Sequence, residues 1–167
     1  MNPDTKKTTL RMIPYGIYVL TAQADDGTVA AATVNWVTQT AFAPPLVVVG
    51  VKTDSGAYAT AKKAGSFALN MLGKGQQGIA FAFFKPTQVA DGTLSGQPYR
   101  RGSTGSPILT NAPAAVECKI VEIVERGDHH IFVGEVVDAH LVKPIEGRAD
   151  AAILEMKELG EKTFYGG

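Results

Sequence analysis

The sequence contains one cysteine, Cys118, among 167 residues. A single cysteine cannot form an intramolecular disulfide or a thiolate metal cluster, and this scarcity is typical of a cytoplasmic protein. The first ten residues lack the apolar stretch of a signal peptide, and no apolar run approaches the length of a membrane span. We therefore expect a cytoplasmic protein that does not enter the membrane.

Neither sign of charge is in excess, because the sequence contains 16 basic and 16 acidic residues. The densest basic runs are pairs such as Arg100-Arg101, which are too small to follow a phosphate backbone, so we expect no nucleic-acid partner. The length fits one domain, residues 1–167, that buries enough surface to fold without disulfides or a structural metal.

Histidines are also few, and their spacing argues against a metal site. His129 and His130 are adjacent in an expected strand, so their side chains point to opposite faces and cannot share an ion. His140 lies too far along to complete a standard ligand set with either of them. No Ser-His-Asp order and no paired carboxylates stand out for hydrolysis, so we expect neither a metal site nor a hydrolase.

The chain is instead rich in β-branched and aromatic segments. Six of them predict strands, at residues 15–24, 28–36, 46–51, 66–72, 115–125 and 129–142. Asp25-Asp26-Gly27 and Arg126-Gly127-Asp128 are typical of hairpin turns, and Pro44-Pro45 precedes the third strand. Strands joined mostly by short turns favour an antiparallel barrel over a parallel sheet.

A few helices and one long loop complete the expected pattern. The helices are predicted at residues 55–64, 76–84 and 151–159. Asp54 and Asp150 can cap two of them, and Gly65 and Gly160 can end them. Residues 85–113, rich in glycine, proline, serine and threonine, predict a long loop.

The last strand is apolar on both faces. Ile131 and Val133 alternate with Phe132 and Val136, whereas an ordinary two-faced sheet shows polar residues on one parity. One face can fill the barrel, and the other must pack on a helix or on a second copy of the chain. We expect a homodimer, because closed two-fold dimers are the commonest solution.

Residues 73–78 match the G-x-G-x-x-G pattern of dinucleotide-binding turns, follow a strand and precede a helix. A Rossmann unit needs a second parallel strand after that helix. The segment FKPTQVAD (residues 84–91) contains a proline and few apolar residues, so it does not suit a central strand. We interpret the glycines as a plain turn.

Four segments together carry a family resemblance. They are IPYGIYVLT (13–21), AATVNWVTQTAFAPPLVVVGV (31–51), FALNML (67–72) with the following Gln76 and FAFFK (81–85), and GDHHIFVGEVVDA (127–139). In this order they resemble the flavin reductase-like family of FMN-binding split barrels. The resemblance implies a mostly β fold, a six-stranded antiparallel Greek-key split barrel with a few short peripheral helices. Tyr15 and Trp36 depart from the family pattern at positions near the flavin or the nicotinamide.

The segment at the end of the second strand is the expected flavin cradle. Its backbone amides and the Asn35 side chain can bond the flavin edge, and Trp36 can cover the ring, although Trp36 taken alone suits a core or interface position better. A helix N-terminus near a lysine and hydroxyls suits the phosphate. The expected cofactor residues are Thr33, Val34, Asn35, Trp36, Thr38, Gln39, Lys52, Thr53, Ser55 and Lys85. Without the resemblance, a solvated loop explains Thr38 and Gln39 equally well, and Lys85 is better explained as a solvated loop lysine.

The resemblance also places His129 near the flavin and the nicotinamide, as the expected catalytic residue. Tyr15 and Tyr165 are further expected contacts of the nicotinamide. The implied function is NAD(P)H-dependent flavin reduction, in which hydride passes from NADH or NADPH to FMN, or to FAD. Electrons then pass to free flavin, a partner protein, ferric iron or oxygen.

Three alternatives stay open at this point. One is a flavoredoxin-like electron carrier that does not use NAD(P)H directly. Another is a ferric reductase, and the third is a split barrel that binds a different cofactor, such as haem or pyridoxal phosphate.

Overall fold

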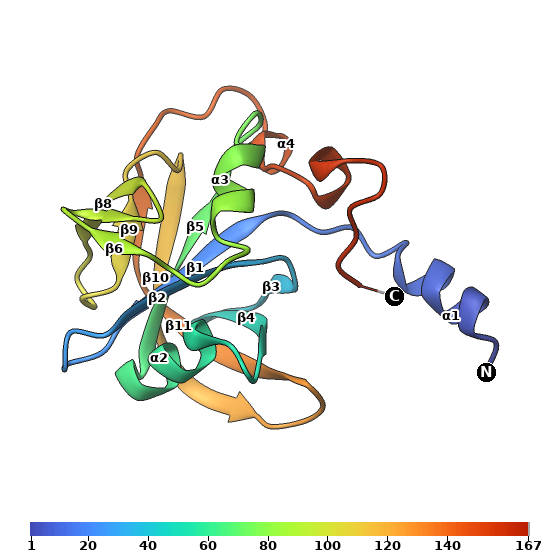
Figure 1. The fold of residues 1–167 in the computed structure, drawn as a ribbon, viewed down its shortest axis with the longest axis horizontal. Coiled ribbons are helices and arrows are strands. Elements are labelled where there is room, and N and C mark those ends of the chain that lie inside the picture. The colour runs from blue at the N-terminus through green and yellow to red at the C-terminus, as the bar shows by residue number, and fades with distance from the viewer. Residues whose placement is uncertain (167) are drawn as a thin grey trace.

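The computed structural model describes residues 1–166, which form two antiparallel sheets and a few short helices (Figure 1). The strands are β1 (Tyr18–Gln23), β2 (Val29–Val34), β3 (Val37–Phe42), β4 (Pro45–Lys52), β5 (Ser66–Met71), β6 (Val89–Ala90), β7 (Thr93–Leu94), β8 (Gln97–Arg101), β9 (Pro107–Leu109), β10 (Ala114–Val124) and β11 (His129–Leu141). The helices are α1 (Pro3–Leu10), α2 (Gly56–Ala64), α3 (Gln77–Ala82), α4 (Ala149–Ala152) and the 3-10 helix η1 (Met156–Leu159). In this part of the chain no helix is long and apolar enough to cross a bilayer.

The large sheet has seven strands in the order β2-β1-β5-β10-β11-β4-β3. The mostly β composition is confirmed, and each of the six predicted strands lies in this sheet. The predicted number is wrong, because β3 is a seventh strand, and the sheet does not close because β2 and β3 stay at opposite edges. β3 was missed since its sequence, VTQTAF, is half polar. It pairs with β4 at an exposed edge, where threonine and glutamine face solvent.

The expected loop at residues 85–113 is also wrong in part, because it contains the four-stranded sheet β6-β7-β8-β9. These strands have two to five residues each, too short for a periodic pattern. They are stabilised by burial of Leu94, Ile108 and Leu109 and by bonds to the large sheet. The backbone nitrogen of Leu109 donates to the Asn70 side chain over 2.8 Å.

Helix α2 begins one residue later than expected. Ser55 rather than Asp54 caps it, since the Ser55 hydroxyl accepts from the backbone nitrogen of Tyr58 at 3.1 Å. Asp54 instead pairs with Lys52 over 3.2 Å. Gly65 ends the helix in the left-handed conformation, with a φ of 68°, as the sequence predicts.

The predicted helix at residues 151–159 is wrong, because it is split into α4 and η1. Between them Ile153 and Glu155 make single β-bridges to Gly73 and Gly16, and Leu154 is fully buried. Those contacts with distant segments outweigh the helical preference of the sequence. Asp150 lies inside α4 and pairs with Arg148 instead of capping the helix.

The glycine pattern at residues 73–78 does not belong to a βαβ unit. Helix α3 follows β5, but the next strand, β6, pairs antiparallel with β7 in the small sheet. The interpretation of these glycines as a turn therefore agrees with the topology.

Strand β11 separates the core from an exposed face. Phe132 is fully buried against Tyr58 and Phe67, whereas Ile131 and Val137, on the opposite face, are 40% and 43% exposed. Gly134 lies on the buried face, where a Cβ atom would come within 2.7 Å of the Cβ of Cys118. This close contact requires glycine at that point of the strand.

Candidate functional site

A cavity of about 370 Å³ lies beside β2, the end of β4 and the start of α2. Seven of the expected site residues line it together: Thr33, Val34, Asn35, Lys52, Ser55, His129 and Tyr165. They come from four separate segments of the chain. Antiparallel pairing of β4 with β11 places Lys52 directly opposite His129, which brings two of these segments together.

His129 is held between an acid and a phenol. Its Nδ1 lies 2.9 Å from Asp128 Oδ1, and its Nε2 lies 2.6 Å from the Tyr165 hydroxyl oxygen. A neutral imidazole satisfies both contacts by donating from Nδ1 to Asp128 and accepting at Nε2 from Tyr165. The bond to His129 lowers the pKa of Asp128, and burial raises the pKa of Tyr165, so the phenol keeps its proton.

Asn35 and Trp36 turn toward the same region after β2 ends. Asn35 is buried, and its Nδ2 donates to the backbone oxygen of Tyr165 over 2.9 Å. The Trp36 ring lies 4.6 Å from the His129 ring, centroid to centroid. It also covers Gly50, where an added Cβ would lie 3.2 Å from the indole, so glycine leaves room for the ring. Within residues 1–166, the buried Trp36 Nε1 has no hydrogen-bond partner.

The junction between β4 and α2 forms the cationic end of the cavity. The Lys52 ammonium is about half exposed and pairs with Asp54. Local bonds occupy the hydroxyl of Ser55, which donates to the Lys52 backbone oxygen over 2.7 Å and caps α2. Thr53 does not line the cavity, and its hydroxyl donates to the backbone oxygen of Asp128. Of this group, Lys52 has the charge best placed for an anion.

Five other expected residues lie outside the cavity lining. Thr38 and Gln39 are exposed on β3 and bond to nearby backbone oxygens. Lys85 is exposed beyond α3, and Tyr15 lines a neighbouring cavity of about 710 Å³. Trp36 is not among the lining residues either, but its ring contacts those of His129 and Tyr165.

The sequence interpretation missed apolar lining residues that come from distant segments. Phe83 and Phe84 line one wall, and Met156 and Leu159 line another. Thr33 positions the first wall, because its hydroxyl donates to the Ala80 backbone oxygen over 2.7 Å. The aromatic run FAFFK was visible in the sequence, but no local signal places Met156 or Leu159 at the site.

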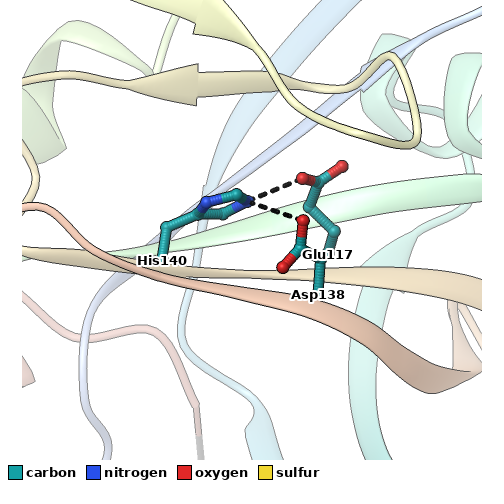
Figure 2. A group of neighbouring side chains, drawn as sticks. All are labelled: Glu117, Asp138 and His140. Carbon is teal, nitrogen blue, oxygen red and sulfur yellow. Dashed lines mark hydrogen bonds and ion pairs between the residues drawn. The ribbon is translucent and has the colours of Figure 1, made fainter.

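A second polar cluster lies away from this cavity, where Glu117, Asp138 and His140 meet across β10 and β11 (Figure 2). Their ligand atoms lie within 4.8 Å of one another, a spacing that could hold a metal ion. The sequence interpretation compared His140 only with the other histidines and missed these carboxylates, which the antiparallel register places side by side.

The oxygens of Glu117 are already occupied by donors. Oε1 accepts from His140 Nε2 at 2.7 Å and from the Ser103 backbone nitrogen at 2.9 Å, and Oε2 accepts from the Thr104 backbone nitrogen at 2.7 Å. Burial alone would raise the pKa of Glu117. The bonds from Thr104, His140 and Ser103 outweigh burial and lower the pKa to about 2. The cluster therefore ties the segment after β8 to the large sheet.

Comparison with known proteins identifies the family. Residues 10–154 match the family described as flavin reductase like domain. The chain belongs to this family. It is 29% identical over 136 residues to a flavin reductase of Pseudomonas putida, covering 81% of this chain and 78% of that protein.

Two further proteins that are similar to this chain have more specific names. The reductase component of a 4-nitrophenol 4-monooxygenase/4-nitrocatechol 2-monooxygenase from Rhodococcus opacus is 35% identical over 124 residues, covering 74% of this chain and 64% of that protein. The structure of an NADH:FAD oxidoreductase from Streptomyces globisporus superposes with a TM-score of 0.67 at 30% identity. That match covers 77% of this chain and 76% of the other.

Proposed function

We propose that the cavity beside β2 and β4 binds the flavin from which this family takes its name. The observation that carries the proposal is the meeting of Asn35, Lys52 and His129, from three distant segments, in the lining of one cavity. The ring would lie near Asn35 and His129, and the phosphate would lie near Lys52 and the start of α2. Thr38, Gln39, Thr53 and Lys85 are weaker candidates, since they do not line the cavity.

The residues present fit such a group. Asn35 is a buried amide whose Nδ2 faces a carbonyl, as it would face a polar ring edge. Gly50 leaves the space that Trp36 fills, so the indole can pack against His129 and Tyr165, two residues that line the cavity. The exposed ammonium of Lys52 is free to exchange Asp54 for a phosphate, because an exposed ion pair is weak.

The protein is a flavin-dependent oxidoreductase that acts on NAD(P)H, as its family membership and relatives indicate. When bound, the flavin supplies a ring that accepts a hydride from the nicotinamide and passes the electrons to an acceptor. The side chains bind and orient. Asn35 would fix one polar edge, Lys52 would offset the phosphate charge, and His129 would hold the carboxamide of the nicotinamide through Nε2.

The finer features belong to the same proposal. We favour FMN over FAD, because Lys52 and the start of α2 suit a terminal phosphate. We favour free flavin or a partner monooxygenase as acceptor, by analogy with the Rhodococcus reductase component. A homodimer, one domain over residues 1–167 and a cytoplasmic location complete the proposal.

Absorption spectra and NAD(P)H oxidation test the function directly. We expect the protein to bind FMN and to oxidise NADH or NADPH with free flavin as acceptor. Parallel assays with chelated ferric iron separate a flavin reductase from a ferric reductase. A protein that binds flavin but leaves both nicotinamides unoxidised would instead be an electron carrier, and one that binds no flavin would contradict the proposal.

A further inference from the structure

The segment Gly160–Gly166 lines the proposed flavin cavity through Thr163, Phe164 and Tyr165, and it contacts polar residues of that cavity. Tyr165 provides three of these contacts: its hydroxyl to His129 Nε2 at 2.6 Å, its backbone oxygen to Asn35 Nδ2 at 2.9 Å, and its ring 5.4 Å from that of Trp36. Tyr165 therefore occupies the atoms through which His129 and Asn35 would hold a ligand.

The same segment divides two cavities. Thr163, Phe164 and Tyr165 line both the flavin cavity and the neighbouring cavity of about 710 Å³. The flavin cavity, at about 370 Å³, lies near the lower end of the usual range for small-molecule sites, about 300–1,000 Å³. A flavin ring with a nicotinamide stacked on it needs more room than a flavin ring alone. Displacement of the segment would join the two cavities and provide that room.

Arg11 holds the segment from the other side. This residue ends helix α1, which projects from the body of the molecule close to the last described residues (Figure 1). Its Nε donates to the Gly166 backbone oxygen over 3.3 Å, and its guanidinium carbon lies 3.9 Å from the centre of the Phe164 ring. Contacts of these two kinds are individually weak at an exposed position, so they can open and close readily.

We infer that Arg11 latches the segment Gly160–Gly166 over the flavin cavity, in the place that the nicotinamide must take. Arg11 is then a positioning residue, since it acts on the reaction only through this segment. The inference rests on the proposed function. A nicotinamide can reach His129 Nε2 only after the Tyr165 hydroxyl has left it, so the latched state competes with NAD(P)H.

Competition between the latched segment and the nicotinamide determines the direction of the change in nicotinamide affinity. When only a fraction of the molecules is open, the apparent dissociation constant of the nicotinamide is the intrinsic one divided by that fraction. Loss of the latch raises the open fraction and lowers the apparent constant. Flavin affinity should change less, because the segment bonds only Asn35 among the residues proposed for the flavin, whereas the side-chain bonds of Lys52 and Ser55 do not involve it.

Arg11→Met tests the latch in the full-length protein, with Lys6→Met as the matched control. Lys6 is an exposed cation of α1 that neither contacts the segment nor lines a cavity. Trp36 is the only tryptophan in the sequence. In the flavin-free protein, quenching of its fluorescence by acrylamide therefore reports how well Tyr165 covers it. We expect quenching to increase in Arg11→Met and to stay at the parent value in Lys6→Met.

Steady-state kinetics then test the consequence for the nicotinamide. We expect Arg11→Met to lower KM for NADH or NADPH about threefold to tenfold, with kcat and the flavin dissociation constant within about twofold of the parent. Arg11→Lys keeps the cation over Phe164 and should restore most of the parent KM. Unchanged quenching, a raised KM, or an effect on flavin affinity alone would overturn the latch. If the parent protein binds no flavin, the proposed function is contradicted, but the quenching measurement still tests the latch.

Discussion

His129 and His130 are neighbours in the chain but contact different parts of the molecule. His129 lines the cavity proposed for the flavin and contacts Asp128, Trp36 and Tyr165. His130 points the other way, where its Nδ1 lies 2.7 Å from the Tyr58 hydroxyl on α2. The alternation of side chains along β11 therefore gives one histidine to the site and the other to packing.

This arrangement predicts different effects for two alanine substitutions. His129→Ala should slow flavin reduction by NAD(P)H about tenfold to a few hundredfold and leave flavin bound, since it removes an orienting contact rather than the hydride chemistry. His130→Ala should leave the rate intact and lower stability. Single-turnover reduction at matched flavin occupancy measures both rates. A normal rate in His129→Ala with a slow one in His130→Ala would reverse the two roles.

Glu117 predicts an acid-sensitive fold. Its pKa is about 2 in the folded protein, below the ordinary 4.5, so its ionised form stabilises the native state above pH 4.5. That contribution is lost as the pH falls from 4.5 toward 2. Glu117→Gln should therefore be less stable than the parent at pH 7, by on the order of 2–3 kcal/mol, and the difference should shrink in acid.

Urea unfolding at pH 7 and at pH 3 measures this difference. Glu122→Gln is a suitable control, because Glu122 is an exposed carboxylate on the same strand, β10. An equal response of the two variants to pH would show that Glu117 is not the group that makes the fold sensitive to acid.

At the scale of elements, the junction of β4 and α2 places Lys52 at the cavity, whereas Lys63 on α2 lies outside it. We predict that Lys52→Ala weakens FMN binding about tenfold or more but hardly changes riboflavin binding, because the ammonium can offset only the phosphate charge. Fluorescence titration of both flavins measures this. Lys63→Ala, on the outer side of α2 where Lys63 pairs with Asp26, should change neither. Equal losses for FMN and riboflavin would place the phosphate elsewhere.

The sequence predicted those elements whose pattern is local. The six predicted strands and the hairpin turn at Asp25-Asp26-Gly27 follow from β-branched runs and turn residues, and the structure confirms them. The short strands β6 to β9 have no such pattern and exist because Leu94 and Ile108 are buried beneath them. The last helix is broken for a related reason, since Ile153 and Glu155 bond to distant glycines.

The candidate site likewise contains residues that a local sequence pattern predicts and residues that no local pattern predicts. Asn35, Lys52 and His129 come from motifs that could be read along the chain, and one cavity brings them together. Met156 also lines that cavity, but it arrives through the break between α4 and η1, which no local pattern predicts. The contact of Arg11 with Phe164 joins the two ends of the chain and has no signal in the sequence.

At the scale of the whole molecule, one face of β11 leaves apolar side chains exposed. Ile131 and Val137 are 40% and 43% exposed, and His129 lies on the same face of the strand. Covering this face with a second copy would place the dimer contact beside the flavin cavity, so assembly and flavin binding would be linked.

Sedimentation of the flavin-loaded protein at micromolar concentration tests this assembly. We expect a species of twice the 17.6 kDa chain mass. Val137→Lys should shift it toward the monomer and weaken flavin binding, since a buried lysine at the contact is costly. A fully loaded parent monomer would argue against the dimer.

The burial of Cys118 has a practical consequence. Its side chain is fully covered, and burial, with the nearby charge of Glu117, raises its thiol pKa to about 12, so little reactive thiolate forms at neutral pH. The native protein should therefore react very little with maleimide reagents. A cysteine introduced at the exposed Glu161 could carry a dye whose distance from Trp36 follows the segment in real time, with no need to remove the native thiol.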